Sequence, residues 1–257
     1  MSSEHIVTAY DEELKHLNEM VVRMGGLAEA QLAGAIQAIV KRDSVLAARI
    51  IEGDTEVDDL EHQINEDAIR LLALRQPMAT DLREIIAALK ISSDLERIAD
   101  YATNVAKRTL ALVDLPPVKP VHVVPRMSKL AQSMITDVLD AYIERDADKA
   151  VRVWERDEEL DEIYTSLLRE LLTYMMEDPR SIGACSHLLF IAKNIERVGD
   201  HATNVAENIY YLVHGSPLLG RRPKGETDDI VPILKAPAAR RKAPKPAAKR
   251  RAKRRSR

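Results

Sequence analysis

The 257-residue sequence contains one cysteine, one phenylalanine, one tryptophan and nine glycines. The lone Cys185 cannot form an internal disulfide, which excludes a disulfide-stapled scaffold and favours a reducing compartment. The low glycine and aromatic content argues against sandwiches, barrels and glycine-rich nucleotide folds. No apolar run approaches the roughly 18 residues of a membrane span, and the polar start of the chain lacks the order of a secretory signal. We therefore expect a soluble, cytoplasmic protein.

The residues that are abundant are typical of helices. Hydrophobic residues make up 46% and charged residues 31% of the chain, with Ala, Leu, Ile, Glu, Asp and Arg prominent. Between a few prolines, apolar residues recur three and four positions apart, as in the series that runs from Val57 to Leu71. This pattern predicts an all-α fold with six long helices, near residues 4–42, 44–74, 79–113, 125–146, 147–177 and 181–214.

The two halves of the chain match each other. Residues 94–106 (DLERIADYATNVA) align without a gap with residues 194–206 (NIERVGDHATNVA). The Arg-Asp pair at 42–43 likewise corresponds to the pair at 145–146. The offset of 100 residues between the matching segments is too long for a solenoid repeat. The sequence therefore predicts two tandem, sequence-related three-helix bundles.

A basic tail follows the repeat. Residues 221–257 contain 15 basic and 3 acidic residues, a net charge of +12, whereas the first 220 residues contain 23 and 38, a net charge of −15. The tail has little to bury, so we expect it to be disordered and able to contact an anionic polymer or lipid. The predicted parts are residues 1–115 (first bundle), 116–220 (second bundle) and 221–257 (tail).

Pairs of acidic residues one helical turn apart recur at equivalent places in both halves. The four pairs are Glu96/Asp100, Glu196/Asp200, Asp54/Asp58 and Asp157/Asp161. Like charges at this spacing repel by about 0.2–0.5 kcal/mol on an exposed helix, so their duplication indicates a cation between them. On the third helix of each half, such a pair is expected roughly opposite the apolar stripe. A solvated acidic face with Arg97 and Arg197 as local partners is the alternative.

Further polar residues lie close to these pairs in the sequence. Asn104 and Asn204 continue each row by one turn. His201 adjoins Asp200 and can ligate a metal, although Tyr101 takes its place in the first half and a lone surface histidine often has no such role.

Two segments, Glu13-x-x-His16 and Asp59-x-x-His62, are similar to the ligand pattern of di-iron bundles. They lie in one half only, so a carboxylate-bridged metalloenzyme is a weaker alternative. A nucleic-acid-associated protein that acts through the tail is another, although the tail lacks aromatic residues for base stacking. No phosphate-binding glycine loop, nucleophile elbow or zinc-protease helix occurs, so we expect no enzymatic activity.

Residues 96–106 and 196–207, together with 74–83, resemble the duplicated signature of the PhoU family, and the resemblance extends over about residues 5–214. It implies two three-helix bundles that bind metal clusters on their surface. The metal ligands it implies are Glu96, Asp100, Glu196 and Asp200, with Asp54, Asp58, Asp157 and Asp161 as weaker candidates and Asn104, Asn204, His201 and Glu207 as neighbours. The implied cofactors are transition metal ions, iron or zinc before manganese or nickel.

The resemblance also implies a function. Members of the family are cytoplasmic accessory proteins of the phosphate-specific ABC transporter. They restrain phosphate uptake and hold the phosphate-responsive sensor kinase off when phosphate is plentiful. The implied partners are the transporter's ATPase subunit (PstB-like), the sensor histidine kinase (PhoR-like) and a second copy of the chain in a homodimer. Lys107 stands in the place of Glu207, so weaker or sparser metal binding is expected in the first half.

Overall fold

The computed structural model describes residues 2–220, so the predicted disorder of residues 221–257 lies outside the described residues. Helices and short connections account for this part of the chain, and it contains no strand. The α-helices are α1 Ser2–Lys41, α2 Ser44–Glu52, α3 Asp54–Arg75, α4 Ala79–Val113, α5 Val124–Glu144, α6 Ala147–Glu155, α7 Asp157–Glu177 and α8 Ile182–His214. Two 3-10 helices are η1 Lys119–Val123 and η2 Pro179–Ser181.

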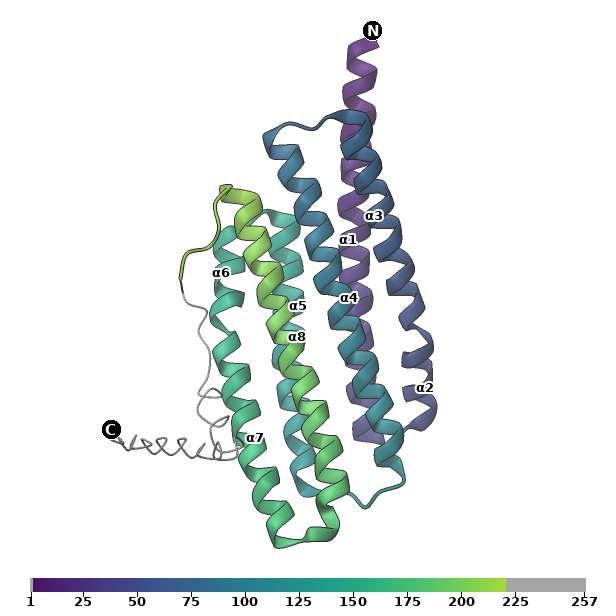
Figure 1. Cartoon of the computed structure of the whole chain (residues 1–257), viewed down its shortest axis with the longest axis vertical. Helices are drawn as coiled ribbons and strands as arrows, with labels where there is room; N and C mark the ends of the chain where they lie inside the picture. Colours follow the sequence, from purple (N-terminus) through teal and green to yellow (C-terminus); the bar gives the residue numbers. More distant parts are fainter. Residues whose placement is uncertain (1, 221–257) are drawn as a thin grey trace, which may run out of the picture.

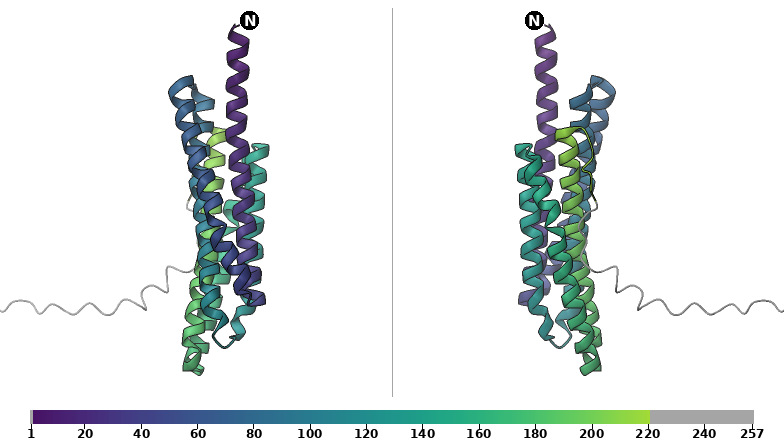
Figure 2. Two further views of the ribbon diagram at one scale, coloured as in Figure 1. Left: turned by 90° about the vertical axis from the view of Figure 1, so that its right-hand side faces the viewer. Right: turned by 90° about the vertical axis from the view of Figure 1, so that its left-hand side faces the viewer.

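The helices form an elongated bundle in which the long helices lie side by side (Figures 1 and 2). Helices α1 to α4 make up the first half and α5 to α8 the second, and each half is a three-helix unit whose middle helix is divided in two. The halves meet mainly where α4 packs along α8, and also where α1 packs on α5. Buried apolar side chains from both halves form one continuous core. The predicted all-α fold with two related three-helix units is confirmed.

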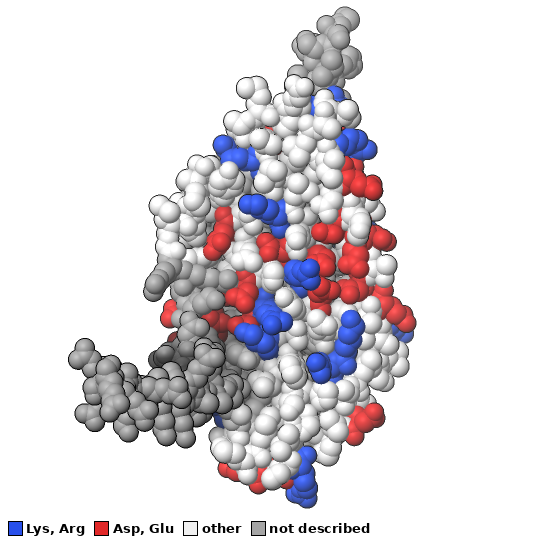
Figure 3. All heavy atoms as spheres, in the orientation of Figure 1, with Lys and Arg blue, Asp and Glu red and all other residues white. Residues whose placement is uncertain are grey.

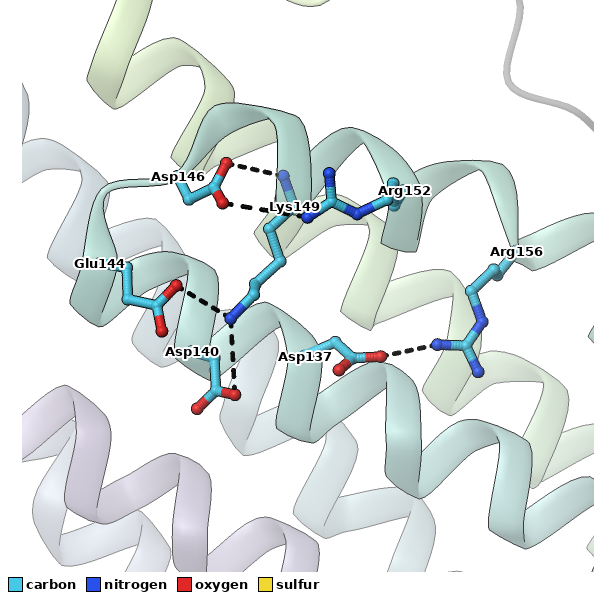
Figure 4. A network of polar contacts seen from close by, with 7 residues as sticks. All are labelled: Asp137, Asp140, Glu144, Asp146, Lys149, Arg152 and Arg156. Carbon is cyan, nitrogen blue, oxygen red and sulfur yellow. Dashed lines mark hydrogen bonds and ion pairs between the residues drawn. The ribbon is translucent and has the colours of Figure 1, made fainter.

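The middle helix of each half differs from the prediction, which gave one continuous helix. It is interrupted at Gly53 in the first half and at Arg156 in the second. The backbone carbonyl of Gly53 accepts a hydrogen bond from Gln31 Nε2 of α1 at 3.0 Å. Arg156 donates to Asp137 Oδ2 of α5 at 2.7 Å (Figure 4). It also donates to Ser133 Oγ of α5 at 2.7 Å. Apolar periodicity continues through both breaks, so the sequence pattern does not reveal them.

The repeated Arg-Asp pairs form the corner between the first and middle helices of each half. Arg42 and Arg145 have positive φ angles of 53° and 55°, which end α1 and α5 in the left-handed conformation. Asp43 and Asp146 then cap α2 and α6, since each side chain accepts a hydrogen bond from the backbone N–H three residues ahead. Such a cap contributes about 1 kcal/mol to stability.

The predicted apolar stripe of the middle helix is buried. Val57, Leu60, Ile64, Ala68 and Leu71 of α3 all face the core. Burial of each larger side chain contributes about 1.5–3 kcal/mol, so this face fixes how α3 packs against α1 and α4. Among the helices of residues 2–220, none combines the length and apolar character needed to cross a membrane.

Candidate metal sites

The predicted carboxylates gather in two sets, one in each half, where the second part of the middle helix begins. In the first half, Asp54 and Asp58 lie in the first turns of α3; the charge of Asp58 acts on Glu96 of α4, and the charge of Asp100 of α4 acts on Asp54. In the second half, Asp157 and Asp161 begin α7, and Asp161 acts on Glu196 of α8. A helix N-terminus stabilises negative charge, which favours acidic residues at the start of α3 and α7.

In the first set, an arginine already lies between two of the carboxylates. Arg97 Nε is 3.3 Å from Glu96 Oε2, and its Nη1 is 3.1 Å from Asp100 Oδ2. Loss of water on burial and the charge of Asp100 raise the pKa of Glu96. Burial, with the charges of Asp58 and Asp100, also raises the pKa of Asp54, although Thr103 and Lys107 oppose this shift. The alternative of an acidic face with a local arginine partner therefore describes the Glu96/Asp100 pair well.

The second set is buried. Asp157, Asp161 and Glu196 are 1%, 4% and 6% exposed. Glu196 Oε1 accepts a hydrogen bond from Lys193 Nζ at 2.6 Å, whereas its Oε2 is buried without a hydrogen-bond partner. Loss of water raises the pKa of Glu196; Lys193 opposes the shift, and the charges of Asp200 and Asp161 add to it. Glu196 therefore does not belong to a solvated acidic face, because it is buried where α7 packs against α8.

Gly199 of α8 permits close packing between α7 and α8. A Cβ atom at Gly199 would lie 2.5 Å from Leu160 Cδ2 and 3.4 Å from Asp157 Oδ1. Gly199 therefore lets the start of α7 approach α8 directly beside the acidic residues. The first half has Ala99 at the equivalent position, in keeping with the greater exposure of its carboxylates: Glu96 is 22% and Asp100 37% exposed.

The donor set of the second half suits a cation chemically. It consists of carboxylate oxygens, the ligands preferred by hard and borderline cations, and Glu196 Oε2 is a buried acceptor without a partner. Across the described residues, however, no three His, Cys, Asp or Glu side chains converge closely enough to hold a metal ion. Binding would require the carboxylates to rotate toward a common point, and metal binding stays a prediction for both sets.

Two of the predicted neighbours of the metal site instead join the halves. His201 Nδ1 lies 2.8 Å from Asp94 Oδ1, and Asn204 Nδ2 donates to the same oxygen at 3.2 Å. The His201 ring also lies 5.5 Å, centroid to centroid, from the ring of Tyr101. Asp94 is not among the site residues predicted from the sequence. The available signal was that the repeat has Asn194 at this position, the one charge difference in an otherwise closely matched segment.

The other predicted neighbours also point elsewhere. Glu207 is exposed and accepts a hydrogen bond from Trp154 Nε1 of α6 at 2.9 Å. Asn104 lines a basic groove between α4 and α8. Arg197, expected as a partner of the acidic face, lies over the ring of Tyr101 with its Cζ 5.6 Å from the centroid. In the front view, basic side chains run along the middle of the face that carries α4 and α8, with acidic side chains on both sides (Figure 3).

The segments similar to a di-iron pattern do not form a buried site. Glu13 Oε1 pairs with Arg75 Nη2 at 2.8 Å. His16, Asp59 and His62 are exposed, and His62 Nδ1 lies 2.9 Å from the backbone carbonyl of Asp58. A buried di-iron centre built on these residues is therefore excluded. The alternative based on the basic tail lies outside the described part of the chain.

Comparison with known proteins agrees with this architecture. The sequence matches the PhoU domain family twice, at residues 21–109 and 124–209. The "phosphate-specific transport system accessory protein PhoU homolog" of Caulobacter vibrioides is 53% identical over 86% of this chain and 97% of the relative. The homolog of the same name from Rhizobium meliloti is 52% identical over 91% of this chain and 98% of the relative.

Two solved structures are similar as well. PhoU from Pseudomonas aeruginosa has a TM-score of 0.78 at 40% identity, covering 80% of this chain and all of that one. The phosphate transport system regulatory protein PhoU from Streptococcus pneumoniae has a TM-score of 0.77 at 31% identity, covering 82% and 100%. With two matched domains and close relatives over nearly their whole length, the chain belongs to the PhoU family.

Proposed function

We propose that this chain is a cytoplasmic accessory protein of a phosphate-specific transport system, without enzymatic activity of its own. It restrains phosphate uptake and holds the phosphate-responsive sensor kinase off when phosphate is plentiful. The observation that carries the proposal is the identity of 53% with a relative named for this role, over 97% of that relative's length. The names of the relatives describe an accessory protein rather than a catalyst, in line with the sequence-based expectation.

A non-enzymatic accessory protein acts by binding partner proteins. The proposed partners are the ATPase subunit of the transporter and the cytoplasmic portion of the sensor kinase. An elongated bundle of long helices offers extended faces for such contacts (Figure 1). The acidic character of the first 220 residues, with a net charge of −15, favours partner surfaces that are basic.

The test is a phosphate-starvation reporter in the source organism, grown in phosphate-rich medium with and without this gene. We expect deletion to switch the reporter on and a wild-type copy to silence it again. A reporter that stays silent after deletion would contradict the signalling part of the proposal.

We further propose that the second carboxylate set binds a transition metal ion, with iron or zinc favoured. Asp157, Asp161, Glu196 and Asp200 would hold it, and the ion would supply positive charge that links α7 to α8. Burial of three carboxylates and the unpartnered Glu196 Oε2 support this assignment. The residues of the first set bind more weakly, because Arg97 already contacts both Glu96 and Asp100.

Metal analysis of the purified protein tests this proposal. The double variant Glu196→Ala/Asp200→Ala should lose most of the bound metal. The matched control Asp137→Ala/Asp140→Ala removes two carboxylates from α5 that pair with Arg156 and Lys149 (Figure 4), and it should keep its metal. Equal metal content in the wild type and both double variants would overturn the assignment.

A further inference from the structure

A groove with basic walls lies between the second half of α4 and the first half of α8. It encloses about 480 Å³, within the range of small-molecule sites. No acidic residue lines it. The lining residues are Asn104, Lys107, Arg108, Ala111, His187, Phe190, Lys193, Asn194 and Arg197.

The positive charge of the groove is not a requirement of the fold. Because the halves are related by sequence, each lining residue has a counterpart at the opposite end of the α4–α8 contact. Lys107 corresponds to Glu207, Arg108 to Asn208 and Asn194 to Asp94 at the constant offset of 100 residues. The same helix pairing therefore forms with a carboxylate and an amide in place of Lys107 and Arg108, although Lys90 and Arg97 keep two basic residues at that end. The basic end calls for an explanation other than packing.

The only phenylalanine of the chain lies in this groove rather than in the core. Phe190 is 50% exposed, although phenylalanine is among the residues most often buried. The guanidinium of Arg108 lies over its ring, with Cζ 4.5 Å from the centroid. The counterpart of Phe190 in the first half is Lys90. The groove thus presents an aromatic and guanidinium surface beside its cations.

Three further polar side chains that line the groove are those of His187, Asn194 and Lys193. His187 Nδ1 is buried and has no hydrogen-bond partner. The side-chain amide nitrogen of Asn194 donates to the Phe190 carbonyl at 2.7 Å. Lys193 Nζ contacts Glu196 at 2.6 Å, so it connects the groove to the second carboxylate set.

From these features we propose that the groove binds a nucleoside phosphate. Aromatic rings and arginine guanidinium planes stack on nucleobases, which accounts for the exposed Phe190–Arg108 pair. Lys107, Arg197 and Lys193 supply charge for the phosphate groups, which prefer charge-assisted hydrogen bonds from such side chains. A simple phosphate site would use the cations but would leave the aromatic surface without a function.

Calorimetric titration of the full-length chain with ADP tests the proposal, in low salt and with a chelator so that no metal bridges phosphate to the carboxylates. Adenosine and pyrophosphate, the two halves of the probe, are titrated separately. We expect ADP to bind more tightly than either half. Since base stacking is worth about 1–3 kcal/mol per base, Phe190→Ala should weaken ADP binding by about fivefold or more. Lys107→Glu should weaken it further by charge reversal.

The matched control is Lys90→Ala, which changes the residue equivalent to Phe190 at the other end of the contact and should leave ADP binding unchanged. Phe190 and Lys107 are exposed, so neither substitution removes core packing. Pyrophosphate binding as tight as that of ADP, with no effect of Phe190→Ala, would overturn the nucleoside assignment. Lack of ADP binding at millimolar concentration, or binding that persists unchanged in both groove variants, would overturn the proposed site.

Discussion

Asp94 of α4 and His201 of α8 join the two halves of the chain, with Oδ1 and Nδ1 2.8 Å apart. Asn204 donates to the same carboxylate oxygen at 3.2 Å, so one aspartate binds two residues of the other half. Both Asp94 and His201 are largely shielded from water, with side chains 15% and 20% exposed. This contact is polar, whereas the buried side chains at the interface are mostly apolar. It has no equivalent in the repeat, because Asn194 and Tyr101 occupy the corresponding positions.

Replacement of Asp94 should therefore weaken the packing of the halves. We expect Asp94→Ala to lower the free energy of unfolding by about 1–3 kcal/mol, because two partners lose their acceptor. The counterpart variant, Asn194→Ala, removes only a bond to the carbonyl of Phe190 in its own helix and should cost less. Urea unfolding measures the free energy of unfolding of both variants. Equal losses would show that the contact between the halves stabilises the protein no more than a hydrogen bond within one helix.

The stability of the folded protein should depend on pH through the ionisation of Glu196. Its pKa is raised in the folded protein, chiefly by loss of water, so the neutral form is favoured there. Stability from this group is fully present below its ordinary value of 4.5 and is lost as pH rises through the folded pKa. In metal-free protein, Glu196→Gln should raise the thermal midpoint at neutral pH by about 2–4 °C, the effect of 1 kcal/mol in a chain of this size.

That gain should shrink as the pH falls toward 4.5, where the wild-type carboxyl is itself protonated. Thermal unfolding followed by circular dichroism at several pH values, with a chelator present, measures it. Glu207→Gln on the exposed side of α8 is the control and should change stability by less than about 0.5 kcal/mol. A Glu196→Gln protein that is less stable than the wild type at neutral pH would contradict the account.

The contact between α7 and α8 should not tolerate a side chain at Gly199. A Cβ there would lie 2.5 Å from Leu160 Cδ2, so Gly199→Ala should destabilise the protein by about 1–3 kcal/mol through overpacking. Gly183→Ala in the same helix is the control, because its Cβ would lie 4.0 Å from Leu115 Cδ1. That change should be stabilising by up to about 1 kcal/mol from helix propensity alone. Thermal unfolding compares the two variants, and a stabilised Gly199→Ala protein would refute the packing argument.

The cap of α6 gives a further prediction. Asp146 Oδ1 accepts a hydrogen bond from the backbone N–H of Lys149 at 2.9 Å (Figure 4). Asp146→Ala should lower the free energy of unfolding by about 1 kcal/mol. Asp148→Ala removes an exposed charge from the same turn without removing the cap, and its effect should be smaller. Chemical denaturation distinguishes them, and a larger loss for Asp148→Ala would contradict the assignment of the cap.

The sequence predicts the architecture well because two signals agree. Apolar spacing marks the buried face of each helix, as in Val57 to Leu71, and the repeat shows that the same unit occurs twice. The breaks at Gly53 and Arg156 are not predictable in this way. At these breaks Gln31 of α1 donates to the Gly53 carbonyl, and Arg156 donates to Asp137 of α5. Only the packed structure brings these residues together. The division of the chain at residue 115 stays a prediction, since both halves share one core.

The candidate site is predicted less completely. Spacing correctly places Glu196 beside Asp200 on one helix, but burial by α7 depends on the fit between Gly199 and Leu160. His201 follows Asp200 in the sequence yet points across the interface, because adjacent helical residues face different directions. The basic groove combines residues of α4 and α8, which no local pattern relates.

The proposed function, restraint of phosphate transport, can be measured in cells. The most direct measurement is the initial rate of radiolabelled phosphate uptake in phosphate-rich medium, in strains with the gene, without it, and with a restored copy. The account predicts faster uptake after deletion and a return to the original rate on restoration. An uptake rate that is the same in all three strains would contradict it.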